Sequence, residues 1–303
     1  GVALAVQREI AALDSASQGL DTCPLGAGAV AGTDLPIDTR RTAALLGFAA
    51  PTTHALDAVA SRDVALRLLA TATGLAVTLS RLAADLQLWS TVEFGFVGFP
   101  DRLVGGSSAM PQKRNAFLLE HVRAKPGQAL GALAAAASTM ATTSFTNSIE
   151  VGTEAVASVW HGLAAVTDAV LLSQVLISGA RPEPVRMLTR ATDGFTTATF
   201  LANRLMRDGM PFRTAHRVVG TAVRAAVDAG TTRLDGVGET PDIPTVVRAQ
   251  AYGGGPGAFD EPFTVAAARW LEHAGRLRDR RRALADADVA LADAVRRHCG
   301  VGG

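Results

Sequence analysis

Cysteine is scarce in this chain of 303 residues. The two present, Cys23 and Cys299, cannot form a disulfide framework or a zinc ligand set, so we expect free thiols in a reducing compartment. An excess of charge of one sign is also missing, because 29 basic residues face 28 acidic ones. This balance argues against a nucleic-acid binder and against a polybasic membrane-surface protein.

Lysine is nearly absent. Lys113 and Lys125 are the only two, so arginine supplies 27 of the 29 basic residues. Arginine cannot replace lysine where a site needs a compact ammonium group. Both lysines are therefore candidates for function, with chance survival in an arginine-rich sequence as the alternative.

The first residues lack the basic segment and following apolar run of a secretory signal. The longest uncharged run, residues 126–149, is diluted by Ser, Thr, Gln, Asn and Gly, and we do not expect it to span a membrane. We therefore expect a cytoplasmic protein. Since Gly1 is not a start methionine, we expect either a fragment or a chain from which a tag was cut.

Apolar residues recur three and four positions apart along most of the chain, which indicates helices. The pattern over residues 55–90 exceeds the usual helix length and predicts one helix, or two stacked end to end. Further patterns cover residues 116–143, 154–178, 192–207, 213–229 and 262–298. We predict an all-α fold, with a long-helix bundle over residues 1–182 and a smaller C-terminal helical domain over residues 183–303.

One segment between two helical patterns concentrates polar and flexible residues. Residues 105–115 (GGSSAMPQKRN) hold two glycines, two serines, a proline, an asparagine and a lysine. The glycines permit unusual backbone conformations, and the serine oxygens can act as bases or nucleophiles. Lys113 and Asn115 can hold an anion. An ordinary polar loop is the alternative interpretation.

Residues 106–115 resemble the GSSxMPxKxN signature of the aspartase/fumarase superfamily. Other segments resemble argininosuccinate lyase in particular, in one unbroken order over about residues 1–275. They are residues 24–32 (PLGAGAVAG), 61–63 (SRD), 93–97 (EFGFV), 210–216 (MPFRTAH) and 252–256 (YGGGP). The resemblance implies the long-helix bundle of that superfamily. It covers the C-terminal two-thirds of such an enzyme and leaves out the N-terminal domain.

The resemblance implies a carbon–nitrogen lyase for a small-molecule substrate, with no cofactor or metal. Such an enzyme removes a proton next to a succinyl carboxylate and releases fumarate, in this family from argininosuccinate to give arginine. Ser107 matches the base, and Lys113 and Asn115 match residues that hold the substrate carboxylate. Ser108 is expected to bind substrate beside them. Glu120 matches a glutamate that pairs with a histidine of the N-terminal domain on another subunit.

The family also implies a homotetramer in which each site draws on three subunits.

One segment of the chain departs from the family's sequence pattern. Where argininosuccinate lyases carry a tyrosine, a glutamine and a lysine that contact substrate, this chain has Phe145, Glu150 and Thr153. The segment thereby loses a hydroxyl at Phe145 and a cation at Thr153 and gains a carboxylate at Glu150. The sequence therefore does not decide whether the substrate is argininosuccinate. Pro126 lies inside the helix expected over residues 116–143 and should kink or split it.

Three functions follow as alternatives. The leading one is an argininosuccinate lyase, present here as a fragment or as one part of a split enzyme. The second is a related lyase that acts on another N-substituted aspartate. The third is a non-catalytic structural or partner subunit. The complete set of signature residues favours catalysis, whereas the missing N-terminal domain favours decay or truncation.

Overall fold

The structure is a computed structural model and describes residues 1–299. The chain folds as two compact units. Among the described residues, the first comprises residues 1–88, 99–179 and 266–299, and the second comprises residues 89–98 and 180–265. The division at residue 182 that the sequence suggests remains a prediction. The structure groups residues 266–299 with the long helices.

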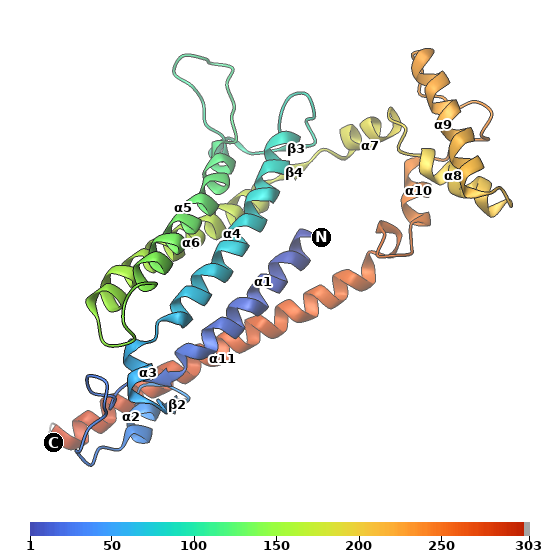
Figure 1. Ribbon diagram of the computed structural model, residues 1–303. Helices are drawn as coiled ribbons and strands as arrows, with labels where there is room; N and C mark the ends of the chain where they lie inside the picture. Colours follow the sequence, from blue (N-terminus) through green and yellow to red (C-terminus); the bar gives the residue numbers. More distant parts are fainter. Residues whose placement is uncertain (300–303) are drawn as a thin grey trace. The chain divides into compact units, whose positions relative to one another are not determined.

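The described residues are mainly helical, which confirms the all-α fold class (Figure 1). The first unit contains α1 (Val2–Ser17), α2 (Thr39–Leu45), α3 (Ala55–Ala60), most of α4 (Asp63–Trp89), α5 (Phe117–Met140), the π-helical turn η3 (Glu150–Ala155), α6 (Val156–Gly179) and most of α11 (Asp260–Cys299). The pattern over residues 55–90, for which one helix or two successive helices were predicted, therefore forms two helices, α3 and α4.

Two short sheets complete the secondary structure. In the first unit, β1 (Thr22–Cys23) pairs in parallel with β2 (Ala50–Pro51), with Thr22 opposite Ala50. In the second unit, β3 (Val97–Gly98) pairs antiparallel with β4 (Arg181–Pro182). Both cysteines are free thiols, Cys23 buried and Cys299 exposed, as expected.

A seven-residue repeat of buried side chains joins α4, α5 and α6. The buried positions below alternate between three and four residues apart on α4 and α6, and on α5 they include two steps of seven. This is the spacing of helices that pack nearly parallel with interlocking side chains. On α4 they include Leu69, Ala72, Ala76, Leu79, Ala83 and Leu86; on α5, Leu119, Val122, Ala129 and Ala136; on α6, Val159, Gly162, Val166, Ala169, Ser173 and Leu176. On α5 and α6 many of these residues are small, so the backbones of these two helices can approach closely.

Gly162 lies where α6 is in close contact with both α4 and α5. A Cβ atom built there would lie 2.5 Å from Cδ1 of Leu69 on α4 and 3.0 Å from Cβ of Ala132 on α5. Leu69 is fully buried and packs with Ala136 and Val159 in one apolar cluster. A side chain at this position would therefore displace the end of Leu69 and press on Ala132.

Pro126 does not split α5. It is the tenth residue of a continuous helix that runs from Phe117 to Met140. A proline lacks the N–H that would bond the carbonyl four residues earlier, here that of Val122. Of the two outcomes expected, a kink or a split, the structure excludes the split, and packing against α6 along the helix accounts for its continuity.

The helix α11 lies along α1, which explains why it belongs to the first unit (Figure 1). Arg276 donates hydrogen bonds to Asp14 Oδ2 at 2.9 and 3.1 Å. Arg280 forms an ion pair with Asp21 and donates to the carbonyl oxygen of Gly47 at 2.9 Å. These contacts link α11 to residues more than 230 positions earlier in the sequence.

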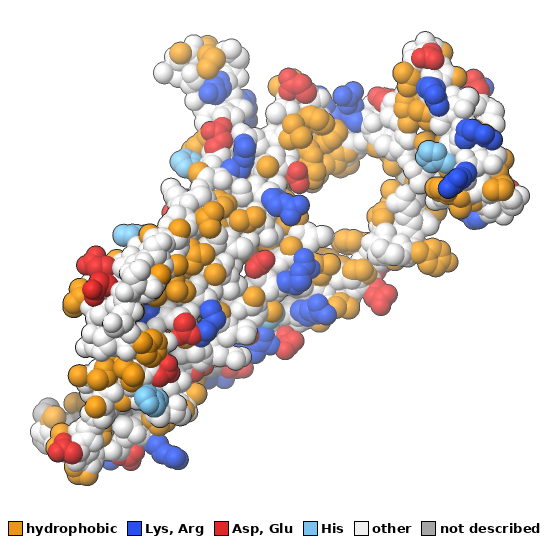
Figure 2. Space-filling view, in the orientation of Figure 1, with side chains coloured by type: hydrophobic (Ala, Val, Ile, Leu, Met, Phe, Trp, Pro, Cys, Tyr) orange, Lys and Arg blue, Asp and Glu red, His pale blue; other side chains and the backbone are white. Residues whose placement is uncertain are grey.

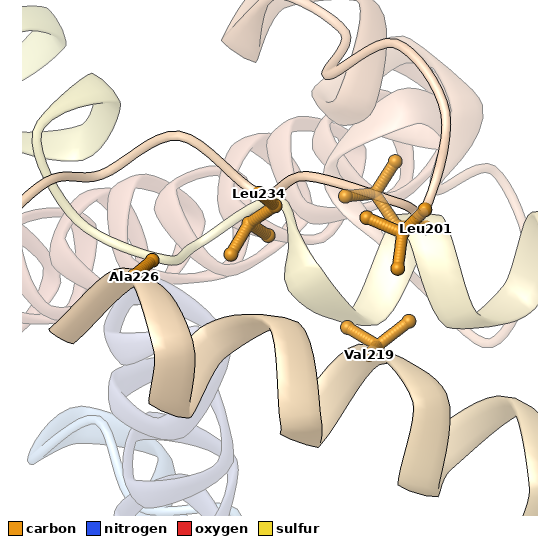
Figure 3. Packing of buried hydrophobic residues seen from close by; sticks show 5 residues of the cluster. Leu201, Val219, Ala226 and Leu234 are labelled. Atoms are coloured by element: carbon orange, nitrogen blue, oxygen red, sulfur yellow. The ribbon is translucent and has the colours of Figure 1, made fainter. Parts of the chain in front are cut away.

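The second unit has its own small core. Its helices are α7 (Pro184–Thr192), α8 (Ala198–Arg207), α9 (Phe212–Asp228) and α10 (Ile243–Ala249). Leu201 of α8 packs against Val219 of α9, with Ala226 and Leu234 nearby (Figure 3). Arg204 donates to the carbonyl oxygens of Val237 and Glu239, both at 2.9 Å, and so fixes the loop after α9.

Two helical stretches, α4 and the continuous run Glu150–Gly179, are long and apolar enough to cross a membrane by length and composition alone. In the structure both contribute the buried seven-residue repeat described above. Core helices of soluble bundles meet the same criterion, so this observation is weak evidence for a membrane protein.

We predict that Gly162→Ala lowers the free energy of unfolding by about 1 kcal/mol, because overpacking at the helix contact outweighs the gain in helix propensity. Gly127→Ala on α5 is the matched control, since a Cβ there has no atom within 4 Å. The control should gain roughly 0.5–1 kcal/mol. Chemical denaturation of both variants measures the difference. Equal stabilisation by the two substitutions would contradict the close contact.

Candidate active site

The predicted signature loop is closed at its base by a pair of backbone hydrogen bonds. The N–H of Gly105 donates to the Asn115 carbonyl at 2.7 Å, and the N–H of Asn115 donates to the Gly105 carbonyl at 2.9 Å. A Cβ on Gly105 would lie 2.9 Å from the ring of Phe117, so the base of the loop also packs against the first residue of α5. The loop is thereby anchored to the start of a long helix.

Ser107 lies in a turn that surrounds its hydroxyl oxygen with donors. Oγ accepts hydrogen bonds from the backbone N–H groups of Ala109 and Met110, both at 3.2 Å. Two N–H donors aimed at one oxygen favour its anionic form over the neutral hydroxyl. This arrangement is suited to a serine that serves as a base.

Lys113 is exposed in the same loop. Within residues 1–299 it makes no ion pair, whereas its neighbour Arg114 pairs with Asp101 at 2.5 Å. Ser108 is exposed as well. The role of the Lys113 ammonium group in holding an anionic ligand stays a prediction.

Glu120 lies in the first turn of α5, where the positive end of the helix dipole favours a carboxylate. Asn115 Nδ2 donates to Glu120 Oε1 at 2.7 Å, which links two predicted site residues directly. Gln87 of α4 contributes a longer bond from Nε2 to the same oxygen, at 3.5 Å. Arg123 donates in turn to Gln87 Oε1.

The other predicted substrate contacts lie at the far end of α5. Phe145 is 62% exposed in the segment between α5 and η3. Glu150 and Thr153 are exposed on η3, and such π-helical turns occur often at functional sites. The guanidinium of Arg62 lies next to η3, 3.9 Å from where a Cβ of Gly152 would be.

A carboxylate with a perturbed pKa lies at this same end. The Ser61 hydroxyl donates a hydrogen bond to Asp63 and holds the pKa of that carboxyl below its usual value, with a further contribution from Arg67. Burial acts in the opposite direction and is outweighed. Asp63 is thus an anion over the whole physiological pH range.

The length of α5 separates the two groups of predicted site residues. This helix has 24 residues and is therefore about 36 Å long. The signature loop lies at its first end, and the segment with Phe145 and Glu150 lies at its last (Figure 1). One copy of the chain cannot bring both groups to one substrate.

Sequence reasoning missed Gln87 and Arg123, because no pattern links a residue on α4 to one 36 positions later on α5. Lys125, the other lysine, forms an ion pair with Asp168 of α6 at 2.7 Å and so joins two bundle helices. His121 is exposed and its ring meets that of Phe117 edge to face. Among residues 1–299, no group of three or more His, Cys, Asp and Glu side chains could hold a metal ion.

Comparison with known proteins identifies relatives. A family model described as "Lyase" matches residues 1–131, and one described as "Argininosuccinate lyase C-terminal" matches residues 195–238. The argininosuccinate lyase of Thermus thermophilus is 42% identical over 74% of this chain and 48% of its own length. That of Methanoculleus marisnigri is 41% identical over 73% of this chain and 45% of its own. The chain belongs to the argininosuccinate lyase family.

This member of the family spans about half the length of the curated relatives that it matches. Among solved structures, an EDDS lyase in complex with formate is similar with a TM-score of 0.82 and 26% identity, over 96% of this chain and 63% of that one. A class II fumarase from Schistosoma mansoni has a TM-score of 0.59 at 17% identity, over 74% of this chain and 52% of that one. The second likeness concerns the fold alone. The roles of the individual site residues stay predictions.

Proposed function

We propose that this chain is the main part of a carbon–nitrogen lyase that cleaves argininosuccinate into arginine and fumarate. The observation that carries the proposal is the environment of Ser107, whose Oγ accepts two backbone N–H bonds inside a signature loop. The kinship with argininosuccinate lyases at about 40% identity supports the substrate. The protein then belongs to arginine biosynthesis.

In the proposed reaction, the Ser107 oxygen takes a proton from the carbon next to a succinyl carboxylate. The electron pair left on that carbon is delocalised into the carboxylate, which becomes a dianion. Lys113 and Asn115 bind this dianion more strongly than the ground-state carboxylate, and such differential binding lowers the barrier. The C–N bond then breaks, fumarate forms, and the leaving nitrogen receives a proton on the side of Glu120.

The site requires more than one copy of the chain. The predicted contacts at Phe145, Glu150 and Thr153 lie about 36 Å from the signature loop along α5, so another subunit must supply them. Apolar side chains are exposed along the bundle (Figure 2), and on α6 they are Trp160, Val170, Leu171, Val175 and Ile177. Burial of such a face between subunits is favourable. We infer a homotetramer of a soluble, cytoplasmic protein that binds neither nucleic acid nor membrane.

An N-terminal domain is the remaining part of the proposed assembly. The partner histidine of Glu120 and the anion-binding residues that orient the two succinyl carboxylates are expected on it. Glu120 already has Asn115 and Gln87 on Oε1. Both of these donors reach the same oxygen, and the expected histidine would donate to Oε2.

A lyase acting on another N-substituted aspartate is the second candidate. Two observations favour it: the changed residues at Phe145, Glu150 and Thr153, and the TM-score of 0.82 with an EDDS lyase, a variant of which has been solved with bound fumarate. Both candidates share Ser107 and release fumarate. Parallel assays of the full-length protein with argininosuccinate and with EDDS distinguish them.

We predict that Leu171→Glu dissociates the full-length tetramer, because a carboxylate in an apolar interface is left without a partner. Leu171 is 54% exposed on α6. Thr221→Glu on α9 adds the same charge at an exposed position and should leave assembly intact. Light scattering at micromolar concentration measures the mass. A stable monomer in the unchanged protein would refute the tetramer.

Ser107→Ala in the full-length protein should abolish fumarate release while the assembly keeps its mass. Lys113→Arg should reduce release severely, because a planar guanidinium cannot take the place of a compact ammonium. Absorbance of the released fumarate reports both rates. A near-normal rate for Ser107→Ala would remove this residue from the mechanism.

The 303-residue chain alone should not turn over argininosuccinate. Correct orientation of reactants supplies on the order of 7–11 kcal/mol of barrier reduction, and the groups that orient the substrate are expected on the N-terminal domain. Addition of that domain, fused or as a separate chain, should restore fumarate release. Robust turnover by the chain alone would show that the assignment of the site is wrong.

A further inference from the structure

Glu120 and Arg123 are three residues apart near the start of α5. Residues at this spacing are neighbours on a helix surface, and a glutamate and an arginine placed so normally form an ion pair. Within residues 1–299 this pair is not formed. Arg123 bonds instead to Gln87 of α4, on the adjacent helix.

The amide of Gln87 lies between the two charges. Its oxygen accepts from Arg123 Nη1, and its nitrogen donates to Glu120 Oε1 at 3.5 Å. The two ends of an amide differ in kind, one accepting and the other donating. Arg123 therefore fixes which end of Gln87 faces Glu120, and the donating end meets the carboxylate.

We propose that Gln87 is a positioning residue that keeps Arg123 away from Glu120. The proposal rests on the proposed lyase function, in which Glu120 serves the proton-donating side. With Gln87 in place, Glu120 is held through one oxygen by Asn115 at 2.7 Å and by Gln87, and Oε2 is left for its catalytic partner. A direct ion pair with Arg123 would compete with that partner for the carboxylate.

The packing of α4 on α5 keeps this arrangement in register. Ser80, two helical turns before Gln87, donates from Oγ to the Arg123 carbonyl at 3.4 Å. Leu86 and Leu119, next to Gln87 and Glu120 in the sequence, are buried between the helices. The amide of Gln87 therefore reaches α5 at the turn that carries both charges.

The test is kinetic and uses the full-length assembled protein. Gln87→Met keeps the length of the side chain and removes both hydrogen bonds, so Arg123 becomes free to pair with Glu120. We expect kcat for fumarate release to fall about tenfold, since small displacements of a catalytic group have effects of this size or larger. KM should change less than twofold, because Gln87 does not touch the substrate.

The decisive variant is the double substitution Gln87→Met with Arg123→Met. The double substitution also removes the competing cation. Its kcat should therefore return to within about threefold of the value for the unchanged protein, whereas the single variant loses about tenfold. If Gln87 had only a structural role, the double variant would have a kcat no higher than that of Gln87→Met. Gln128→Met, at an exposed position of α5, is the matched control and should leave kcat unchanged.

A crystal structure of Gln87→Met separates this proposal from the proposed function. Arg123 should move to within about 4 Å of the Glu120 carboxylate, the distance of an ion pair. Arg123 remaining apart from Glu120 would overturn the positioning role, whatever substrate the enzyme uses. If the unchanged protein releases no fumarate from argininosuccinate, the proposed function fails and the crystal structure still decides the role of Gln87.

Discussion

The close packing of α5 on α6 through small side chains, with α4 packed against both through side chains such as Leu69, determines most of what this chain can do. Alanine and glycine at the seven-residue repeat let the backbones of α5 and α6 approach, and Gly162 leaves room for the Leu69 side chain of α4. Helices that pack this closely stay nearly parallel over their whole length. Loops between them therefore emerge only at the two ends of the bundle.

This geometry places the two groups of predicted site residues at opposite ends of α5. The signature loop and Glu120 occur together because both are attached to the first turn of α5. Phe145 and η3 come after the last turn of the same helix, and no loop rearrangement can bring them across its length. An enzyme built from such bundles gains a shared site only by placing the opposite ends of different copies side by side.

The sequence predicts the helices and the signature loop well, because periodic apolar residues and a ten-residue motif are local signals. The rarity of lysine draws attention to Lys113, whose role stays a prediction. The sequence does not decide between a kink and a split at Pro126, because the continuity of α5 depends on packing by other helices. Nor does it reveal the contact of Gln87 with Glu120, because this depends on the register of α4 against α5.

The hydrogen bonds to Ser107 come from residues only two and three positions further along the chain. The oxygen therefore carries its electrostatic environment with it, as part of one short peptide turn. If the loop swings as a body towards a substrate, the donors move with the serine and need no reassembly on arrival. The electrostatic environment of this oxygen is thus a property of the turn itself and does not depend on the bundle.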